Sequence, residues 1–302
     1  MGEVVGAGLL AHVPTIMLPE ADRRALNHGE DTTLVEGLRR LRREVFDVLD
    51  YDTVVVLDTH WASTVEYVVA AQDRRSGLYT AEELPRGMCR VPYDFAGDPE
   101  LARQIAAQGE AHGTWITAID DHYLPIMYGT VNLWSYLGRP DRRWVSMSCC
   151  QTADVEDNLR AGRALGAAIE ASDRRVVLIG SGAMSHTFYP LRQLRDHEAA
   201  GTEHIFTPEA LAADLERLDW FAAGDHARVL DTMPEFLRFK PEARFAHYLI
   251  MVAAMGEEAC TAQGRRYSEY ENSVGTGQVH VWFDRPDGGW QAARPPAEGV
   301  SA

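Results

Sequence analysis

Histidines at the ends of expected β-strands are the residues of this sequence best placed to do chemistry. His12 comes directly after the β-branched run Val4–Leu10, and His60 comes shortly after the run Thr53–Leu57. His186 stands a few residues beyond a third run of this kind. In an open α/β sheet, ligands bind beyond the carboxyl ends of the strands. The sequence therefore predicts that these three side chains gather at one edge of a sheet.

Two of these imidazoles with one carboxylate would make a metal site. That ligand set is typical of non-haem Fe(II) oxygenases, in which it leaves coordination positions for substrate and O₂. The same donors also suit a zinc hydrolase, and His12 and His60 are too far apart in sequence to form a local motif that separates the two. The candidates for the carboxylate are Asp58, Glu242, Glu269 and Glu271. The residues alone leave both the metal and the carboxylate open.

Charge and composition exclude several classes of protein. The 302 residues include 29 basic and 45 acidic side chains, and the formal charge of −16 would repel a phosphate backbone, so we expect no nucleic-acid partner. The four cysteines show no CxxC spacing, which favours a metal site of nitrogen and oxygen donors. No apolar run approaches the ~20 residues of a membrane span. The start, MGEVV, is acidic where a signal peptide is basic. We therefore expect a cytoplasmic protein with no membrane partner.

The order of the expected elements predicts the fold class. Short β-branched runs alternate with longer amphipathic segments, which is typical of an α/β sheet. The runs 54–57 and 176–179 are apolar on both faces, as central strands covered by helices on each side would be. We expect one α/β domain with a central, mostly parallel or mixed sheet, flanked by helices on both faces. Strands are expected at Val4–Leu10, Thr53–Leu57, Val65–Ala71, Trp144–Cys149, Val176–Ile179 and Gln278–Phe283.

Capping residues predict where helices begin and end. Helices are expected from Thr33, from Pro99 to Gly113, from Ala153 to Glu170, from Pro208, and from Pro241 to near Gly256. Glu242 would then stand in the first turn of the last helix, where the helix dipole alone favours an acidic residue. The Gly- and Pro-rich sequence after Asp284 predicts a domain over residues 1–284 and a flexible C-terminal tail over 285–302.

Several motifs, in order along nearly the whole chain, resemble those of a known family. They are HVP at 12–14, NHG at 27–29, DTHW at 58–61, LYTAEELP at 78–85, GDPEL at 97–101, SGAMSH at 181–186 and GTGQV at 275–279. The sequence is similar to the class III extradiol ring-cleavage dioxygenases, and most similar to members that act on 3,4-dihydroxyphenylacetate (homoprotocatechuate). Residues 1–284 would then be the catalytic dioxygenase domain.

The resemblance implies a role for each candidate residue. It makes His12 and His60 ligands of Fe(II), and it makes Glu242 the carboxylate ligand. His186, in SGAMSH, matches the histidine that acts as acid and base beside the metal. His122 resembles a catalytic pocket histidine found in part of the family. The implied substrates are a small aromatic diol and O₂, the product is a muconic semialdehyde, and the expected assembly is a homo-oligomer.

Other functions remain compatible with the same residues. The ring could be that of 2-aminophenol or protocatechuate instead of 3,4-dihydroxyphenylacetate. A zinc-dependent hydrolase would use the same donors around an activated water. The chain could also be a non-catalytic partner subunit, although a subunit without activity has no need of both His12 and His60.

Overall fold

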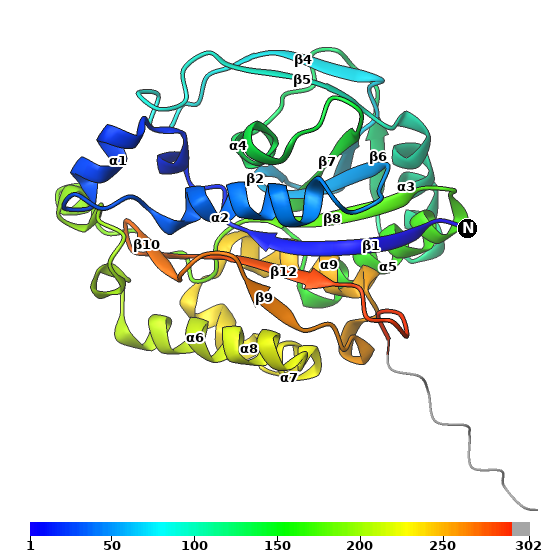
Figure 1. Ribbon diagram of the computed structural model, residues 1–302. Coiled ribbons are helices and arrows are strands. Elements are labelled where there is room, and N and C mark those ends of the chain that lie inside the picture. Colours follow the sequence, from blue (N-terminus) through cyan, green and yellow to red (C-terminus); the bar gives the residue numbers. More distant parts are fainter. Residues whose placement is uncertain (292–302) are drawn as a thin grey trace, which may run out of the picture.

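A ten-stranded mixed sheet forms the centre of the molecule (Figure 1), a computed structural model that describes residues 1–291. The strand order is β4-β5-β7-β2-β8-β1-β12-β9, and off this path β3 pairs with β7 and β6 pairs with β3. The neighbours β7, β2, β8 and β1 run parallel, whereas β12 and β9 are antiparallel additions beyond β1. The predicted α/β fold with a mixed sheet is confirmed. The strands are β1 Glu3–Leu10, β2 Thr53–Ser63, β3 Tyr67–Ala70, β4 Arg74–Tyr79, β5 Val91–Ala96, β6 Ile116–Ile119, β7 Arg143–Cys150, β8 Arg175–Ser181, β9 Gly264–Arg266 and β12 His280–Asp284, with β10 Glu271–Ser273 and β11 Thr276–Gln278 as a separate pair.

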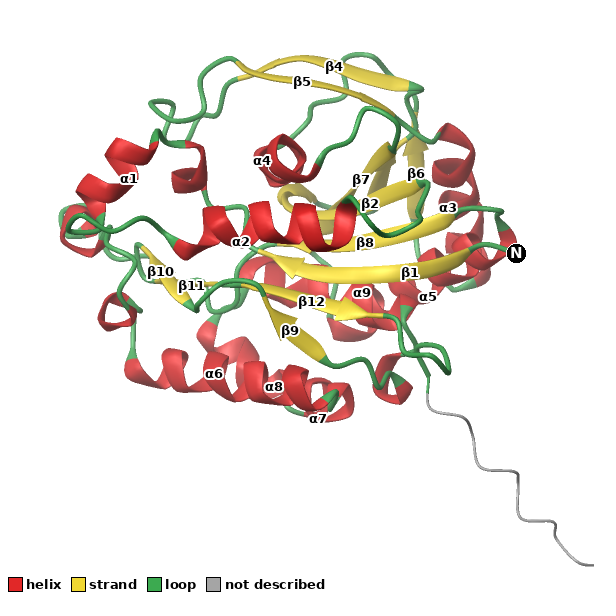
Figure 2. Ribbon diagram, in the orientation of Figure 1, coloured by secondary structure: helices red, strands yellow, loops and turns green. Residues whose placement is uncertain are grey.

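Helices cover both faces of the sheet, as Figure 2 shows. Side chains alternate along β2, so that Val54 and Val56 join the hydrophobic cluster of α2 and α4. Val55 and Leu57 join the cluster of α3, α5 and α9 on the other face. The central strands are therefore buried on both sides, as their apolar runs predicted. The α-helices are α1 Glu20–Leu26, α2 Thr33–Leu41, α3 Pro99–Ala111, α4 Tyr128–Leu137, α5 Val155–Ala171, α6 Pro208–Ala223, α7 His226–Asp231, α8 Met233–Phe236 and α9 Ala246–Ala254.

Capping chemistry located the helices well where it was present. The Asp98 side chain accepts from the amide of Leu101 and begins α3, and Thr207 begins α6 in the same way.

The hairpin β4–β5, the strand β6 and the helix α4 were not expected. The sequence of β4 is RRSGLY, which lacks the apolar alternation of a strand, and α4 carries Gly, Thr and Val near its start, which are weak helix formers.

The chain is held to the domain beyond residue 284. Trp290 is buried, and its indole Nε1 donates to the carbonyl of Val4 at 2.8 Å. Its own carbonyl accepts from the amide of Thr261. The segment 285–291 therefore packs against β1 instead of forming part of a loose tail, and the rest of the expected tail, 292–302, lies outside the described residues. Within residues 1–291 no helix has the length and apolar character to cross a membrane. All four cysteines are free thiols.

Candidate metal centre

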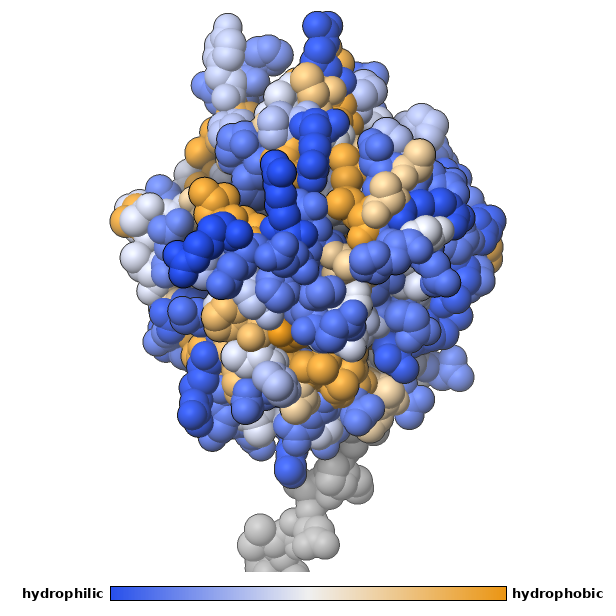
Figure 3. Space-filling view, turned by 90° about the vertical axis from the view of Figure 1, so that its left-hand side faces the viewer, coloured by the Kyte–Doolittle hydropathy of each residue, from blue (hydrophilic) through white to orange (hydrophobic). Residues whose placement is uncertain are grey.

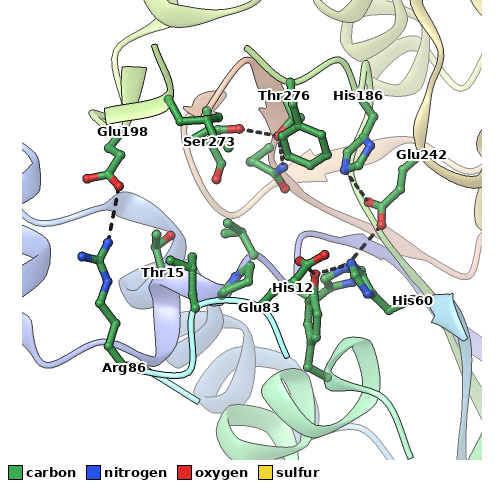
Figure 4. A pocket seen from close by; sticks show the side chains of 18 of the residues that line it. His12, Thr15, His60, Glu83, Arg86, His186, Glu198, Glu242, Ser273 and Thr276 are labelled. Atoms are coloured by element: carbon green, nitrogen blue, oxygen red, sulfur yellow. Dashed lines mark hydrogen bonds and ion pairs between the residues drawn. The ribbon is translucent and has the colours of Figure 1, made fainter. Parts of the chain in front are cut away.

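Three side chains from distant parts of the sequence converge beyond the carboxyl ends of β1 and β2. His12 follows β1, His60 lies inside β2, and Glu242 follows Pro241. One donor atom from each lies within 4.8 Å of the other two. His12 Nε2 is 3.5 Å from Glu242 Oε1, which is longer than a hydrogen bond between such groups. Figure 4 shows the three side chains pointing toward one another at one end of a pocket.

A bulge in β2 sets the position of His60. Asp58 pairs with Ser148 of β7, but the next pair is Ala62 with Cys149, so three residues of β2 have no partner there. The bulge re-aims the side chain of His60, as bulges beside active sites commonly do. The backbone amide of His60 donates to Asp58 Oδ1 at 3.0 Å, which closes the turn. The strand is thus longer than the expected Thr53–Leu57, and His60 belongs to it instead of following it.

Glu242 stands in a strained turn and not in the first turn of an α-helix, as had been expected. The residues after it, Ala243, Arg244 and Phe245, have φ values of 46°, 58° and 66°, and α9 begins only at Ala246. Left-handed residues other than glycine each cost on the order of 1–3 kcal/mol and persist where the surroundings impose them. The amide of Glu242 donates to the carbonyl of Met184, which ties the turn to the segment after β8. Contacts of this kind hold the strained turn, and with it the carboxylate, beside the histidines.

Hydrogen bonds orient the carboxylate of Glu242. The hydroxyl of Thr59 donates to Oε1 at 2.6 Å, and the amide of Ala183 donates to Oε2 at 2.6 Å. Both hydrogen bonds are short, as is typical of hydrogen bonds to an ionised carboxylate. Oε1 faces His12 Nε2 at 3.5 Å, and Oε2 faces His186 Nε2 at 4.0 Å. The two hydrogen bonds are the support that a carboxylate ligand of a metal ion requires.

The hydrogen bonds of His12 determine which ring nitrogen carries the proton. Its Nδ1 lies 2.8 Å from Ser181 Oγ, and that hydroxyl donates its own proton to the carbonyl of Gly129 at 2.7 Å. The serine oxygen must therefore accept, so Nδ1 of the neutral ring is the protonated nitrogen. Nε2 is left with a free lone pair toward Glu242, which is the form that binds a metal.

The charges at the centre are strongly coupled. Burial lowers the pKa of His60 to about 3, so this imidazole is neutral at pH 7. Burial opposes the charge of Glu242, but the three histidines around it hold the pKa of its carboxyl well below the usual range. For His12, burial lowers the pKa and the Glu242 carboxylate more than offsets it, so the pKa is raised. With the Glu242 carboxylate charged and both imidazoles neutral, a bound Fe(II) or Zn²⁺ ion would keep a net charge of +1.

His186 lies beside this centre and is held by a buried anchor. Its Nε2 is 4.0 Å from Glu242 Oε2, and its side chain keeps 23% of its surface exposed toward the pocket. The preceding residue, Ser185, donates through its amide and its hydroxyl to Asp214 of α6. Tyr270 donates to the same carboxylate at 2.5 Å. Burial raises the pKa of Asp214 to about 6.

The structure does not bring His122 to the centre. His122 is exposed in the loop between β6 and α4, its ring packs edge-on against Tyr123, and it is not among the residues that line the pocket. The expected pocket role of His122 thus finds no support in its position. The other three carboxylate candidates lie elsewhere. Asp58 accepts from the Thr130 hydroxyl behind the bulge, and Glu271 accepts from Thr32 and Thr33 at the start of α2. Glu269 is exposed and does not line the pocket.

Two further side chains face the centre that sequence reasoning missed. The hydroxyl of Tyr128, at the start of α4, contacts Nε2 of His60 and lies 3.0 Å from Glu83 Oε2. Tyr128 is buried, and burial raises its pKa far above the ordinary value, so the phenol keeps its proton. Nothing in the sequence marked α4 as a helix, and so nothing placed this tyrosine at the sheet edge.

The pocket that contains these groups is large enough for a substituted aromatic ring. Its volume is about 450 Å³, and it opens on the face of the molecule seen in Figure 3, at the carboxyl end of β1. The three donor residues and His186 line its inner end. Two nitrogen donors and one oxygen donor on one side, with open space on the other, match the facial triad of non-haem iron enzymes.

Comparison with known proteins identifies the family. Residues 6–284 match the model of the catalytic LigB subunit of aromatic ring-opening dioxygenase. The chain belongs to this family. It is therefore a class III extradiol dioxygenase, as the sequence motifs predicted, and a dioxygenase is favoured over the alternatives of a hydrolase and a non-catalytic subunit. Enzymes of the LigB family open aromatic rings with O₂ and generally use a metal ion.

Two relatives with sequences similar to this chain are also named as dioxygenases. The chain is 31% identical over 190 residues, 62% of this chain and 68% of the relative, to 3,4-dihydroxyphenylacetate 2,3-dioxygenase from Escherichia coli. It is 24% identical over 293 residues, 93% of each chain, to the 2-aminophenol 1,6-dioxygenase beta subunit from Pseudomonas sp.. The fold is also similar to the crystal structure of an uncharacterized protein from Escherichia coli K12, with a TM-score of 0.60, 15% identity, and coverage of 92% of this chain and 99% of that one.

Proposed function

We propose that this chain is an Fe(II)-dependent enzyme that opens the ring of a catechol beside its two hydroxyl groups, giving a muconic semialdehyde. His12, His60 and Glu242 hold the metal, and His186 moves protons. One observation carries the proposal: donor atoms of His12, His60 and Glu242 lie within 4.8 Å of one another at the inner end of a pocket that has room for a ring.

The donor set and the family reaction together favour iron. The donors suit several divalent ions, but ring opening consumes O₂, which is a triplet and does not combine readily with a closed-shell diol. Bound Fe(II) would supply a centre that takes both the diol and O₂ and transfers electrons between them. A redox-inactive ion such as zinc would leave that step without an electron path.

The residues of the chain position the diol and handle its protons. The two imidazoles and the carboxylate occupy one side of the centre, so the substrate must approach from the side that Tyr128 and His186 line. His186, whose partly exposed side chain lines the pocket, takes a proton from one hydroxyl of the diol as the ring is activated, and returns it when the ring opens. General acid–base help of this kind is worth ~10²–10⁴-fold in rate. Tyr128 faces the same space with a protonated hydroxyl that donates to Glu83 Oε2, so a substrate oxygen must compete with Glu83 for this proton.

The test is anaerobic reconstitution of the metal-free protein with Fe(II), followed by addition of catechols and then air. We expect O₂ consumption and a yellow product with Fe(II), and neither with Zn²⁺. Turnover with Zn²⁺ and no O₂ uptake would contradict the proposal. The first compounds to compare are 3,4-dihydroxyphenylacetate, 2-aminophenol and protocatechuate, because two of them occur in the names of relatives.

The same material tests the expected assembly. The Pseudomonas relative is named as a subunit, and we propose that this chain assembles with further copies of itself. Size-exclusion chromatography with light scattering of the Fe(II)-loaded protein would show a multiple of the chain mass, whereas a single-chain mass would contradict this part.

A further inference from the structure

The outer part of the pocket, away from the metal ligands, has a largely apolar wall. Leu84 contributes from the loop between β4 and β5, and Phe188, Leu191 and Leu194 contribute from the segment after β8. Phe188 is 52% exposed and Leu191 is 85% exposed, and with Leu84 and Leu194 they form a group of apolar side chains along one pocket. An apolar group bound there would contact part of this apolar surface.

The charges in this outer part are unfavourable for an anion. Among the residues that the structure describes, Arg86 is the only arginine or lysine that lines the pocket, and its guanidinium lies 3.4 Å from Glu198 Oε1. Figure 4 shows this ion pair at the end of the pocket farthest from the metal ligands. Glu83 lies beside Tyr128 at the inner end and offers a substrate anion no counter-ion either. The outer pocket thus has one cation, and that cation already has a partner.

A substrate with a carboxylate on its side chain would therefore lose hydration without gaining a free counter-ion. Burial of a charge without a partner is costly, whereas burial of an apolar group against apolar side chains is favourable. This reasoning applies to the substituent of the ring and not to the diol, which the metal ligands and His186 face.

We propose that the substrate of this chain is a catechol whose ring substituent is uncharged and apolar, such as an alkyl or aryl group. The inference rests on the proposed function, because it takes the inner end of the pocket as the place of the diol. It separates this chain from the carboxylate-bearing compound for which its Escherichia coli relative is named.

The test compares two catechols of the same shape that differ in charge, 4-isobutylcatechol and 3,4-dihydroxyphenylacetate. With the Fe(II)-loaded protein, kcat/KM and the anaerobic Kd from calorimetry should favour the isobutyl compound by at least about tenfold. From 4-methyl- to 4-ethyl- to 4-propylcatechol, affinity should rise about fourfold for each methylene. Equal or better binding of the carboxylate would overturn the inference.

Two variants test the charge argument directly. Glu198→Gln removes one carboxylate and frees Arg86, so the preference for the isobutyl compound should shrink about two- to fivefold. Arg86→Gln should change that preference by less than about twofold. If Arg86→Gln instead costs tenfold or more on 3,4-dihydroxyphenylacetate alone, Arg86 is a carboxylate receptor and the inference is wrong.

The readouts separate the two proposals. Absence of turnover on every catechol, with iron bound and the expected order of Kd values, would contradict the proposed reaction and support the apolar pocket. Turnover with the reverse order of substrates would support the reaction and overturn the pocket inference.

Discussion

Replacement of Thr59 by valine should weaken metal binding without disturbing the fold. Valine has nearly the shape of threonine, so Thr59→Val removes the hydroxyl and little else. That hydroxyl is buried and donates to Glu242 Oε1 at 2.6 Å. Hydrogen bonds to charged groups contribute about 1.5–3 kcal/mol. If Glu242 is a ligand whose orientation depends on this bond, the Kd for Fe(II) should rise about 10- to 150-fold.

The assay is an anaerobic titration of metal-free protein with Fe(II) against a competing chelator. Thr117→Val is the matched control, because the Thr117 hydroxyl also donates to a glutamate, Glu66, outside the pocket. The control should keep the Kd of the parent. A folded Thr59→Val protein with the parent Kd would refute the reasoning, since it would mean that Glu242 does not need this support or does not bind the metal.

Three further predictions follow from the site. His12→Ala should abolish stoichiometric iron binding, as metal analysis would show. His186→Phe should retain iron and lose about 10²–10⁴-fold in kcat, measured by O₂ uptake. Full activity of His186→Phe would exclude a role for His186 as acid and base. His122→Ala should keep the kcat/KM of the parent, because His122 is exposed outside the pocket; a large loss would restore its catalytic assignment. Burial raises the pKa of Asp214 from 3.8 to about 6, so the folded state holds this proton more tightly than the unfolded state does. The free energy of unfolding should therefore fall by up to about 3 kcal/mol as pH rises from about 3 to about 7. Urea unfolding of Asp214→Asn, without metal, should show a flatter dependence over that range; identical slopes would contradict the assignment.

The sequence alone predicted the sheet edge for His12 and His186, because their positions follow from a general rule. His12 and His186 come after strands whose apolar runs are unambiguous, and parallel strands bring their carboxyl ends to one edge. The carboxylate could not be chosen this way. Glu242 reaches the site through a turn of left-handed residues that contains no glycine, and no propensity predicts such a turn. Only the resemblance to the family selected it.

The rest of the site depends on irregular structure. The bulge in β2 that aims His60 arises from pairing with β7, which is a long-range contact without a local signal. Tyr128 was missed for a related reason, since α4 forms by packing against the sheet and not by its helix propensity. Residues 285–291 were expected to be loose on composition alone, but one buried tryptophan, Trp290, holds them.

The two ends of the pocket are built differently. The metal end indicates the reaction, and the outer end indicates the ring substituent. The metal end is made at strand edges and in a strained turn, where buried hydrogen bonds to Glu242 and His12 leave one arrangement. The outer end is made by loops, which tolerate substitution because few buried contacts depend on them. Membership of the family therefore identifies the reaction, which takes place at the metal end. The substituent of the ring must be deduced from the charges and apolar groups of the outer end, where Arg86 and Glu198 already face each other.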